Sequence, residues 1–296
     1  MDTRLREILL VPLTAVRWWR RMTTAPAAER WLVLVGLPVV LTLSWLSGLG
    51  GSLAFRLGAE SLWASERTVV TAFTANYAHL HGRHLFDNLL NFWVTLFAIY
   101  PLVAIAGWGS QFRRSLLVYL FAVPFVIAGV SLAVLETNPW QVAVGFSGIV
   151  AALLGFLPVV GATAACAETD GAVSPAWAIV PFFASLGLVF SGSSTATASP
   201  GGLVGAGWLT GAVVAGGLCW WADRPLHLRP RFSRLSDDHR LAFLIGMTVF
   251  VFGVFGAFVF VGSTTNVWGH LAGYVAGFVF PYCVFVVFPA LATRLR

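Results

Sequence analysis

The property that restricts this 296-residue chain most is its shortage of charge. Charged residues make up 10% of the sequence and apolar residues 58%, whereas soluble proteins average about 25% and 45–50%. So few charges cannot hydrate the surface of a 31.8 kDa globule, and the mean hydropathy of +0.83 agrees. An ordinary water-soluble enzyme is excluded, and we expect the chain to act within or at a lipid bilayer.

Lysine is absent and cysteine is scarce. All 18 basic residues are arginines, and the three cysteines, Cys166, Cys219 and Cys283, lie far apart in the sequence. An odd number of cysteines without a CxxC pair argues against a disulfide framework. There is also no HExxH motif and no cysteine–histidine cluster. The sequence therefore predicts neither a disulfide scaffold nor a metal or other cofactor.

The arginines lie mostly between apolar runs. A pI near 9.9 would indicate nucleic acid as the partner of a soluble domain. Between apolar runs, however, arginines are topology signals and contacts for lipid headgroups. We therefore expect a lipid bilayer, and no nucleic acid, as the partner of these residues.

Apolar runs long enough to cross a bilayer occur repeatedly. A membrane-spanning helix needs about 20 mostly apolar residues, and 17–25 are tolerated. Eight segments meet this condition: 31–50, 84–106, 114–135, 141–163, 175–192, 203–221, 241–263 and 267–289. The sequence predicts an all-α polytopic membrane protein with about eight transmembrane helices, the spans lying within residues 31–291.

The first 30 residues do not resemble a secretory signal. The short apolar run 8–16 is followed by Arg17, Arg20 and Arg21 and by no clear cleavage site. We predict a cytoplasmic amphipathic segment over residues 1–30, lying on the inner membrane surface with Trp18 and Trp19 at headgroup level.

The arginines also set the direction of the spans, because cytoplasmic loops carry the excess of positive charge. With the N-terminus inside, the three outer arginines are Arg56, Arg67 and Arg83. The fifteen inner ones are Arg4, Arg6, Arg17, Arg20, Arg21, Arg30, Arg113, Arg114, Arg224, Arg229, Arg231, Arg234, Arg240, Arg294 and Arg296. This bias predicts cytoplasmic termini, an outer loop over 51–83 and a basic cytoplasmic loop over 222–240. The expected location is a cell membrane, most simply the plasma membrane of a prokaryote.

Four polar side chains occur inside the predicted spans, where each is costly and needs a partner. They are His84, Asn88, Ser147 and His270. Their spans all begin on the outer face, and Ser147 comes six residues into its span, at a depth of about 9 Å for a helical rise of 1.5 Å per residue. The four side chains are therefore predicted to share one outer slab of the membrane.

Together these residues can perform acyl-transfer chemistry. A serine hydroxyl is a weak nucleophile unless a base such as histidine takes its proton. His84, Asn88 and the backbone N–H of Ser147 are suitable donors to the oxyanion that forms. Because a buried histidine can be oriented by packing alone, a Ser147–His270 dyad without a carboxylate is possible.

The glycines around these residues fit the same interpretation. Gly145 and Gly148 would leave the Ser147 hydroxyl accessible and allow other backbone to approach it. Gly273 and Gly277 form a small-xxx-small face on which the His270 helix can pack closely. Taken singly, each feature also has an ordinary structural explanation: GxSG is common at helix contacts, and a histidine at the end of a span is often only hydrogen-bonded. The combination carries the catalytic hypothesis.

The combination resembles the rhomboid intramembrane serine proteases. The residues that carry the resemblance are the segment 79–88 (HLHGRHLFDN), the segment 145–155 (GFSGIVAALLG) and the segment 269–277 (GHLAGYVAG). The resemblance covers roughly residues 70–160 and 265–280, about a third of the chain. It implies a rhomboid-like helical bundle that cleaves transmembrane helices of other membrane proteins near the outer face.

The resemblance also implies a role for each residue. Ser147 would be the nucleophile and His270 the general base, and His84, Asn88 and the Ser147 amide would form the oxyanion site. His79 matches a further histidine of the family, which would act as a structural hydrogen-bonding residue. The oligomeric state and the identity of the substrate stay open.

Two features depart from the family pattern. Bacterial members have one helix between the serine and histidine helices, whereas three are predicted here (175–192, 203–221 and 241–263). Which of the three takes the place of the usual one is left open. In addition, Ala151 stands where many members carry an aromatic residue that stacks on the histidine; Trp268 and Phe146 are candidates for that role.

Two alternative functions remain at this stage. A catalytically silent rhomboid-like protein could bind membrane helices without cutting them, although the presence of both Ser147 and His270 argues against it. A transporter could also place polar residues in spans, but its sites lie near the bilayer midplane, usually on broken helices in internal repeats. The sequence shows no repeat.

Overall fold

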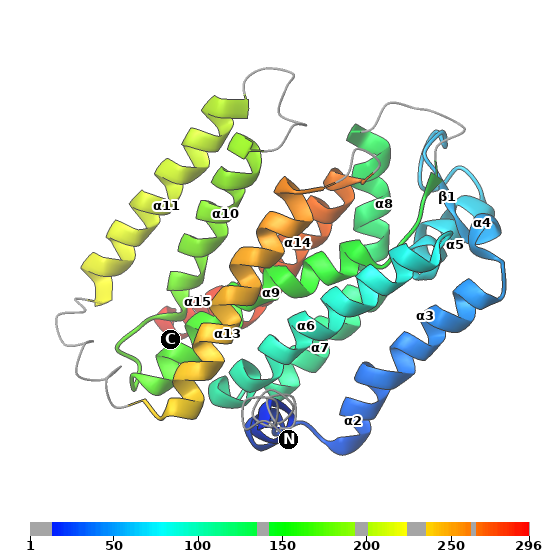
Figure 1. Ribbon diagram of the computed structural model, residues 1–296. Helices are drawn as coiled ribbons and strands as arrows, with labels where there is room; N and C mark the ends of the chain where they lie inside the picture. Colours follow the sequence, from blue (N-terminus) through cyan, green and yellow to red (C-terminus); the bar gives the residue numbers. More distant parts are fainter. Residues whose placement is uncertain (1–13, 135–141, 193–200, 224–234, 262–264, 296) are drawn as a thin grey trace, which may run out of the picture.

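Apolar helices form a bundle in which α9 takes the central place (Figure 1). The computed structural model describes residues 14–134, 142–192, 201–223, 235–261 and 265–295. Its elements are α2 (Ala27–Trp31), η1 (Leu32–Gly36), α3 (Leu37–Leu46), α4 (Gly50–Leu53), β1 (Phe55–Arg56), α5 (Glu66–Thr74), η2 (Ala75–Tyr77), α6 (Gly82–Ala106), α7 (Gly109–Phe121), α8 (Val123–Val134), β2 (Val142–Ala143), α9 (Ser147–Glu168), η3 (Pro175–Ala178), α10 (Ile179–Gly192), α11 (Gly201–Asp223), α13 (Asp237–Val254), η5 (Phe255–Val259), α14 (Val267–Pro281), η6 (Tyr282–Val287) and α15 (Phe288–Arg294).

The helices confirm an all-α polytopic membrane protein. Among the described residues, six helices are long and apolar enough to cross a membrane: Ala27–Leu46, Gly82–Ala106, Ser147–Glu168, Val204–Asp223, Asp237–Val259 and Val267–Thr293. The pair α7–α8, bent by 45°, would make a seventh, and the apolar helix Pro175–Ser191 is shorter. Each of the eight predicted spans overlaps one of these segments, but only six or seven segments pass the test of length and hydropathy, so the number eight stays a prediction.

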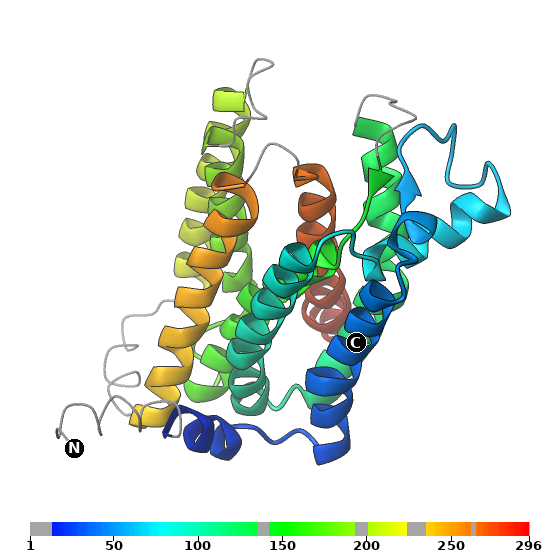
Figure 2. The same ribbon diagram turned by 45° about the vertical axis from the view of Figure 1, so that its right-hand side comes forward.

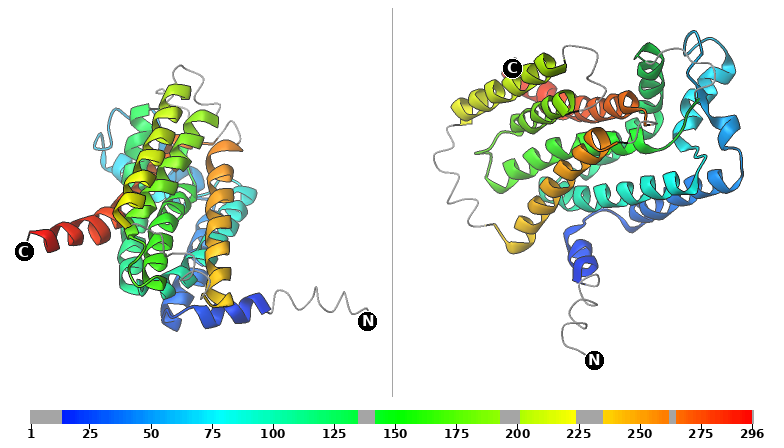
Figure 3. Two further views of the ribbon diagram at one scale, coloured as in Figure 1. Left: turned by 90° about the vertical axis from the view of Figure 1, so that its left-hand side faces the viewer. Right: turned by 45° about the horizontal axis from the view of Figure 1, so that its top comes forward.

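The helices are arranged around α9, which is the most buried of the six. It packs most extensively against α14 and α6, and it also contacts α13, α10, α8 and α7. The hairpin of α10 and α11 stands at one edge of the bundle and α3 at the opposite edge (Figures 1 and 2). The end of the chain, α15, projects away from the other helices (Figure 3).

The predicted start of the fourth span, at residue 141, is wrong. Residues 142 and 143 form the strand β2, which pairs antiparallel with β1, with Phe55 opposite Ala143. Gly145 then has a φ of +121°, which no helix contains, so α9 begins only at Ser147. Ser147 is therefore the first residue of its helix, and a depth of about 9 Å calculated from helical rise does not apply.

The two N-terminal tryptophans pack against the bundle. Residues 14–22 form a helix, but Trp18 is buried in the core of the bundle. The indole N–H of Trp19 donates a hydrogen bond to the carbonyl of Phe97, and its ring stacks against that residue. Both rings contact Phe97 of α6, and the expected placement of the two tryptophans at headgroup level stays a prediction. Residues 1–13 of the predicted amphipathic segment, and 224–234 of the basic loop, lie outside the described residues.

The predicted outer loop, 51–83, contains most of α4, all of β1, α5 and η2, and the first residues of α6. The side chain of Ser65 accepts a hydrogen bond from the backbone N–H of Thr68 and so caps α5. Phe55, Leu57 and Ala72 form a small apolar cluster with Ala128 of α8. This cluster fixes the loop on the bundle beside the start of α9.

Candidate active site

The structure brings Ser147 and His270 into hydrogen-bonding contact. Ser147 opens α9, and His270 is the fourth residue of α14. The Oγ of Ser147 lies 2.8 Å from the Nε2 of His270. The two residues are 123 positions apart, so this contact is a product of the tertiary fold. Its geometry is that of a nucleophile beside its base.

Glycines allow the two helices to approach this closely. A Cβ on Gly273 would lie 2.0 Å from the carbonyl oxygen of Gly148, and one on Gly277 would lie 2.0 Å from that of Ala152. On the other helix, a Cβ on Gly155 would lie 2.1 Å from the carbonyl oxygen of Tyr274. Any larger residue at these positions would force α9 and α14 apart, and with them Ser147 and His270.

A polar contact that sequence reasoning missed sets where α14 begins. The side-chain oxygen of Asn266 accepts a hydrogen bond of 2.8 Å from the backbone N–H of Gly269. Its amide nitrogen donates to the Oγ of Ser131 on α8, also at 2.8 Å. Asn266 thus caps the His270 helix and ties it to a neighbour. An asparagine directly before an apolar run is a known helix-start signal, so the cap, though not the Ser131 contact, could have been predicted.

His84, Asn88 and His79 gather beside Gly145, two residues before Ser147. A Cβ on Gly145 would lie 2.8 Å from the Nε2 of His84 and 3.4 Å from the amide nitrogen of Asn88. That amide lies 2.8 Å from the Nε2 of His79. Gly145 is therefore needed twice, for its positive φ and for the space that His84 occupies.

His79 is buried and neutral, and it holds the Asn88 side chain. Burial, with a smaller contribution from the nearby His84, lowers the pKa of His79 to about 4. A neutral His79 whose Nε2 faces an amide N–H accepts the hydrogen bond from Asn88. Because a side-chain amide has two hydrogens, the second N–H of Asn88 stays available to a bound group.

His270 is held by groups other than those proposed from the sequence. Its Nδ1 lies 3.0 Å from the carbonyl oxygen of Ala257, in the η5 turn that ends α13. Its ring meets that of Phe258 edge to face at 6.4 Å. The ring contacts of Trp268 and Phe146 in the described part of the chain are with other aromatic residues, so neither takes the role suggested for it. Ala151 is buried.

The three helices between Ser147 and His270 differ in how they relate to the site. α13 packs against α6 and α9, and its last turn touches α14. α10 packs behind α14, where Phe182 stacks on Phe278 at 3.8 Å, and α11 packs mainly on α10. The η5 turn at the end of α13 contacts His270 through Ala257 and Phe258.

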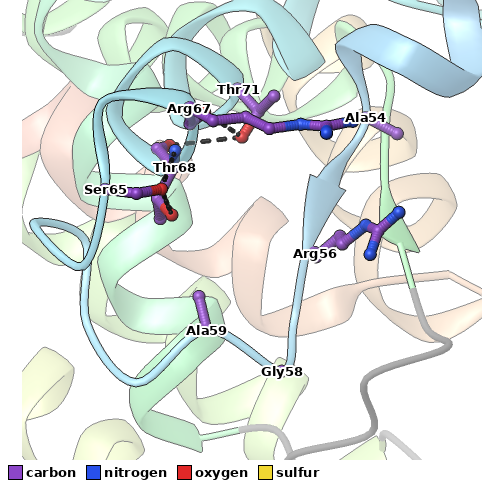
Figure 4. Close-up of a pocket in the computed structure, with 8 residues that line it drawn as sticks. All are labelled: Ala54, Arg56, Gly58, Ala59, Ser65, Arg67, Thr68 and Thr71. Atoms are coloured by element: carbon purple, nitrogen blue, oxygen red, sulfur yellow. Dashed lines mark hydrogen bonds between the residues drawn. The ribbon is translucent and has the colours of Figure 1, made fainter.

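A separate hollow is lined by residues of the segment 54–71 (Figure 4). Its volume is about 280 Å³. Its lining residues are Ala54, Arg56, Gly58, Ala59, Ser65, Arg67, Thr68 and Thr71. None of the residues predicted for catalysis lines it. Within the described part of the chain, no group of three or more histidine, cysteine or acidic side chains is placed to hold a metal ion.

The site thus presents a serine with an adjacent base and several N–H groups at one helix N-terminus. Comparisons with sequence families, with curated proteins and with solved structures give no match for this chain. The resemblance to rhomboid proteases therefore rests on the motifs of this chain and on the geometry described above.

Proposed function

We propose that this chain is a rhomboid-like intramembrane serine endopeptidase that cuts transmembrane helices of other membrane proteins. The observation that carries the proposal is the 2.8 Å contact between the Oγ of Ser147 and the Nε2 of His270. Polar side chains inside an apolar span are costly and mark functional sites, and this pair has the arrangement of a nucleophile beside its base.

In the first step, the Ser147 hydroxyl gives its proton to the Nε2 of His270 while Oγ bonds to the scissile carbonyl carbon. The carbonyl oxygen becomes an oxyanion. His84 and Asn88 lie beside Gly145, and together with the Ser147 N–H they would stabilise this oxyanion. The first N–H groups of a helix have no intrahelical acceptor and lie at the positive end of its dipole, which favours an oxyanion at the start of α9.

The tetrahedral intermediate then collapses. The bond from carbon to nitrogen breaks, and the departing amine takes the proton from His270, leaving an acyl group on Ser147. A water molecule then gives a proton to His270 and its oxygen bonds to the acyl carbon. As the bond from this carbon to the Ser147 Oγ breaks, His270 returns the proton to Oγ, and the carboxylic acid product leaves. Ser147, His270 and one water molecule are the only groups that these steps use.

The substrate class follows from the setting of the site. A transmembrane helix must unwind locally before attack, because its amide groups are engaged in helical hydrogen bonds. We infer that cleavage occurs near the outer face, with both termini of the enzyme in the cytoplasm and eight spans in the plasma membrane of a prokaryote. The fifteen-to-three distribution of arginines supports this orientation.

A fluorescent fluorophosphonate tests the proposal, because it reacts only with an activated serine. Purified protein in detergent should be labelled, and Ser147→Ala and His270→Ala should lose labelling by at least about 1000-fold. Circular dichroism and the melting temperature of each variant control for folding. Equal labelling of all three proteins would contradict the proposal. A folded parent that is not labelled would instead support a silent protein that binds membrane helices.

A further inference from the structure

The last turn of α13 ends beside the imidazole of His270. The helix runs to Val254 and continues as the wide turn η5, in which the N–H of Phe260 donates to the carbonyl of Phe255 at 2.8 Å. Phe260 has a φ of −99° and a ψ of 49°, so the helix ends there. The last carbonyl groups of a helix have no helical N–H to accept from. The carbonyl of Ala257 is one of these groups.

His270 supplies a donor to this carbonyl. Its Nδ1 lies 3.0 Å from the Ala257 oxygen, and its Nε2 lies 2.8 Å from the Ser147 Oγ. A carbonyl can only accept, so the hydrogen of the neutral imidazole must be on Nδ1. The Nε2 lone pair is then free to take the serine proton. The contact with Ala257 therefore selects the one tautomer that can act as a base toward Ser147.

The position of this carbonyl is itself fixed by packing. The neighbouring side chain, Phe258, is fully buried and lies edge to face against both His270 and Tyr274. The hydroxyl of Tyr274 is hydrogen-bonded to Ser185 on α10. The end of α13 is thus held between the His270 helix and α10, which restrains the carbonyl from turning away.

We propose that the Ala257 carbonyl is the positioning group for His270 and fills the place that a carboxylate takes in a catalytic triad. This inference rests on the proposed function of Ser147 and His270. No carboxylate in the described part of the chain forms an ion pair with His270. The C-terminal end of a helix carries a partial negative charge. The carbonyl therefore also favours the imidazolium that forms when His270 takes the serine proton.

The test weakens this carbonyl without changing a side chain. Replacing Phe258 by its α-hydroxy analogue, phenyllactic acid, through nonsense suppression turns the 257–258 amide into an ester, whose carbonyl is a poorer acceptor. Replacing Ala257 by lactic acid is the matched control, because it weakens the carbonyl of Gly256 and also removes one N–H from the same turn. The Phe258 ester should be labelled by fluorophosphonate about tenfold more slowly than the control ester.

A spectroscopic measurement reads the same contact independently of activity. In protein labelled with ¹⁵N-histidine, the ring nitrogen shifts of His270, identified by their loss in His270→Gln, report which nitrogen carries the hydrogen. The unmodified protein should show the Nδ1–H tautomer, and the Phe258 ester should show a larger share of the Nε2–H tautomer.

The outcomes separate this inference from the proposed function. An unlabelled, folded parent would count against the protease. Rapid labelling of the parent with equal rates for the two esters, or an Nε2–H tautomer in the unmodified protein, would overturn the role of Ala257 alone. If the Phe258 ester does not fold, the tautomer of the unmodified protein still decides.

Discussion

At the scale of single residues, the candidate site includes residues that take no part in proton transfer but hold the neighbouring side chains in place. His79 is an example, since it has no role in the proton transfer but holds the amide of Asn88. Gly145 is another, because its missing side chain makes room for His84. Both can be tested by changes that leave Ser147 and His270 in place.

The burial of His79 predicts a dependence of stability on pH. Its folded pKa of about 4 lies below the usual value near 6.5. The folded state therefore favours the neutral ring, and this contribution is present above about pH 6.5 and lost as the pH falls toward 4. Between pH 7 and pH 5 the free energy of unfolding should fall by about 2 kcal/mol more in the parent than in His79→Gln, which keeps an acceptor but cannot titrate. Thermal unfolding in detergent at both pH values measures this, and an equal pH dependence of the two proteins would contradict it.

Substitution of Gly145 should damage both stability and activity. In Gly145→Ala the new Cβ would lie 2.5 Å from the Cε1 of His84, at a φ of +121°. We expect the free energy of unfolding to fall by about 2–4 kcal/mol and the labelling rate by about 100-fold or more. Gly107→Ala is the control, because Gly107 also has a positive φ but open space around its Cα. That variant should lose about 1–2 kcal/mol and keep its labelling rate; the same loss of labelling in both would show that backbone strain, and not the contact with His84, is responsible.

At the scale of elements, the contact between α9 and α14 is what converts two separate motifs into one site. The helices carry Ser147 and His270 at their starting turns, and the glycines lie on their facing surfaces. The hydroxyl of Tyr119, on α7, donates a 2.6 Å hydrogen bond to the carbonyl of Gly277. This bond ties α14 to α7.

Substitution by alanine should therefore be far more damaging at the glycines of α14 than at an exposed glycine. Gly273→Ala and Gly277→Ala each place a methyl group 2.0 Å from a carbonyl oxygen of α9, so the helices must separate. We expect the free energy of unfolding to fall by about 1–3 kcal/mol and labelling by about 100-fold. Gly161→Ala on α9 meets nothing within 4 Å and should gain up to about 1 kcal/mol from helix propensity. Normal labelling of Gly273→Ala would show that the close approach is not required.

At the scale of the whole molecule, the number of membrane crossings between Ser147 and His270 decides whether α9 and α14 start from the same face. We predict that α10 and α11 each cross the bilayer, the short helix Pro175–Ser191 included, so that this number is even. The point can be tested with exposed serines that have a near-isosteric replacement.

The accessibility of single cysteines to a membrane-impermeant reagent shows whether the chain crosses the bilayer an even number of times between Ser110 and Ser236. In a background without Cys166, Cys219 and Cys283, the variants are Ser61→Cys in the predicted outer loop, Ser110→Cys at the start of α7, and Ser236→Cys before α13. We expect a membrane-impermeant maleimide to label only Ser61→Cys in intact cells, and all three after permeabilisation. Labelling of Ser236→Cys from outside, with Ser110→Cys protected, would show an odd number of crossings between them and would remove α10 as a span.

The sequence by itself determined that this is a helical membrane protein. With 10% charged residues the chain cannot hydrate the surface of a soluble globule, and in lipid its backbone hydrogen bonds must be made within helices. It also singled out Ser147, His270, His84 and Asn88, since polar groups are conspicuous in apolar runs. It misplaced the start of α9 because periodicity and hydropathy do not register a two-residue strand paired across more than 80 residues.

Only the tertiary structure decided how His270 is held. The Ala257 carbonyl is a backbone group, which every residue has, so no residue type in the sequence could mark it as a partner. What makes it available is the place where α13 ends, and what brings it to His270 is the packing of α13 against α14. Contacts of this kind arise from where helices end and meet, and neither is contained in the order of polar and apolar residues.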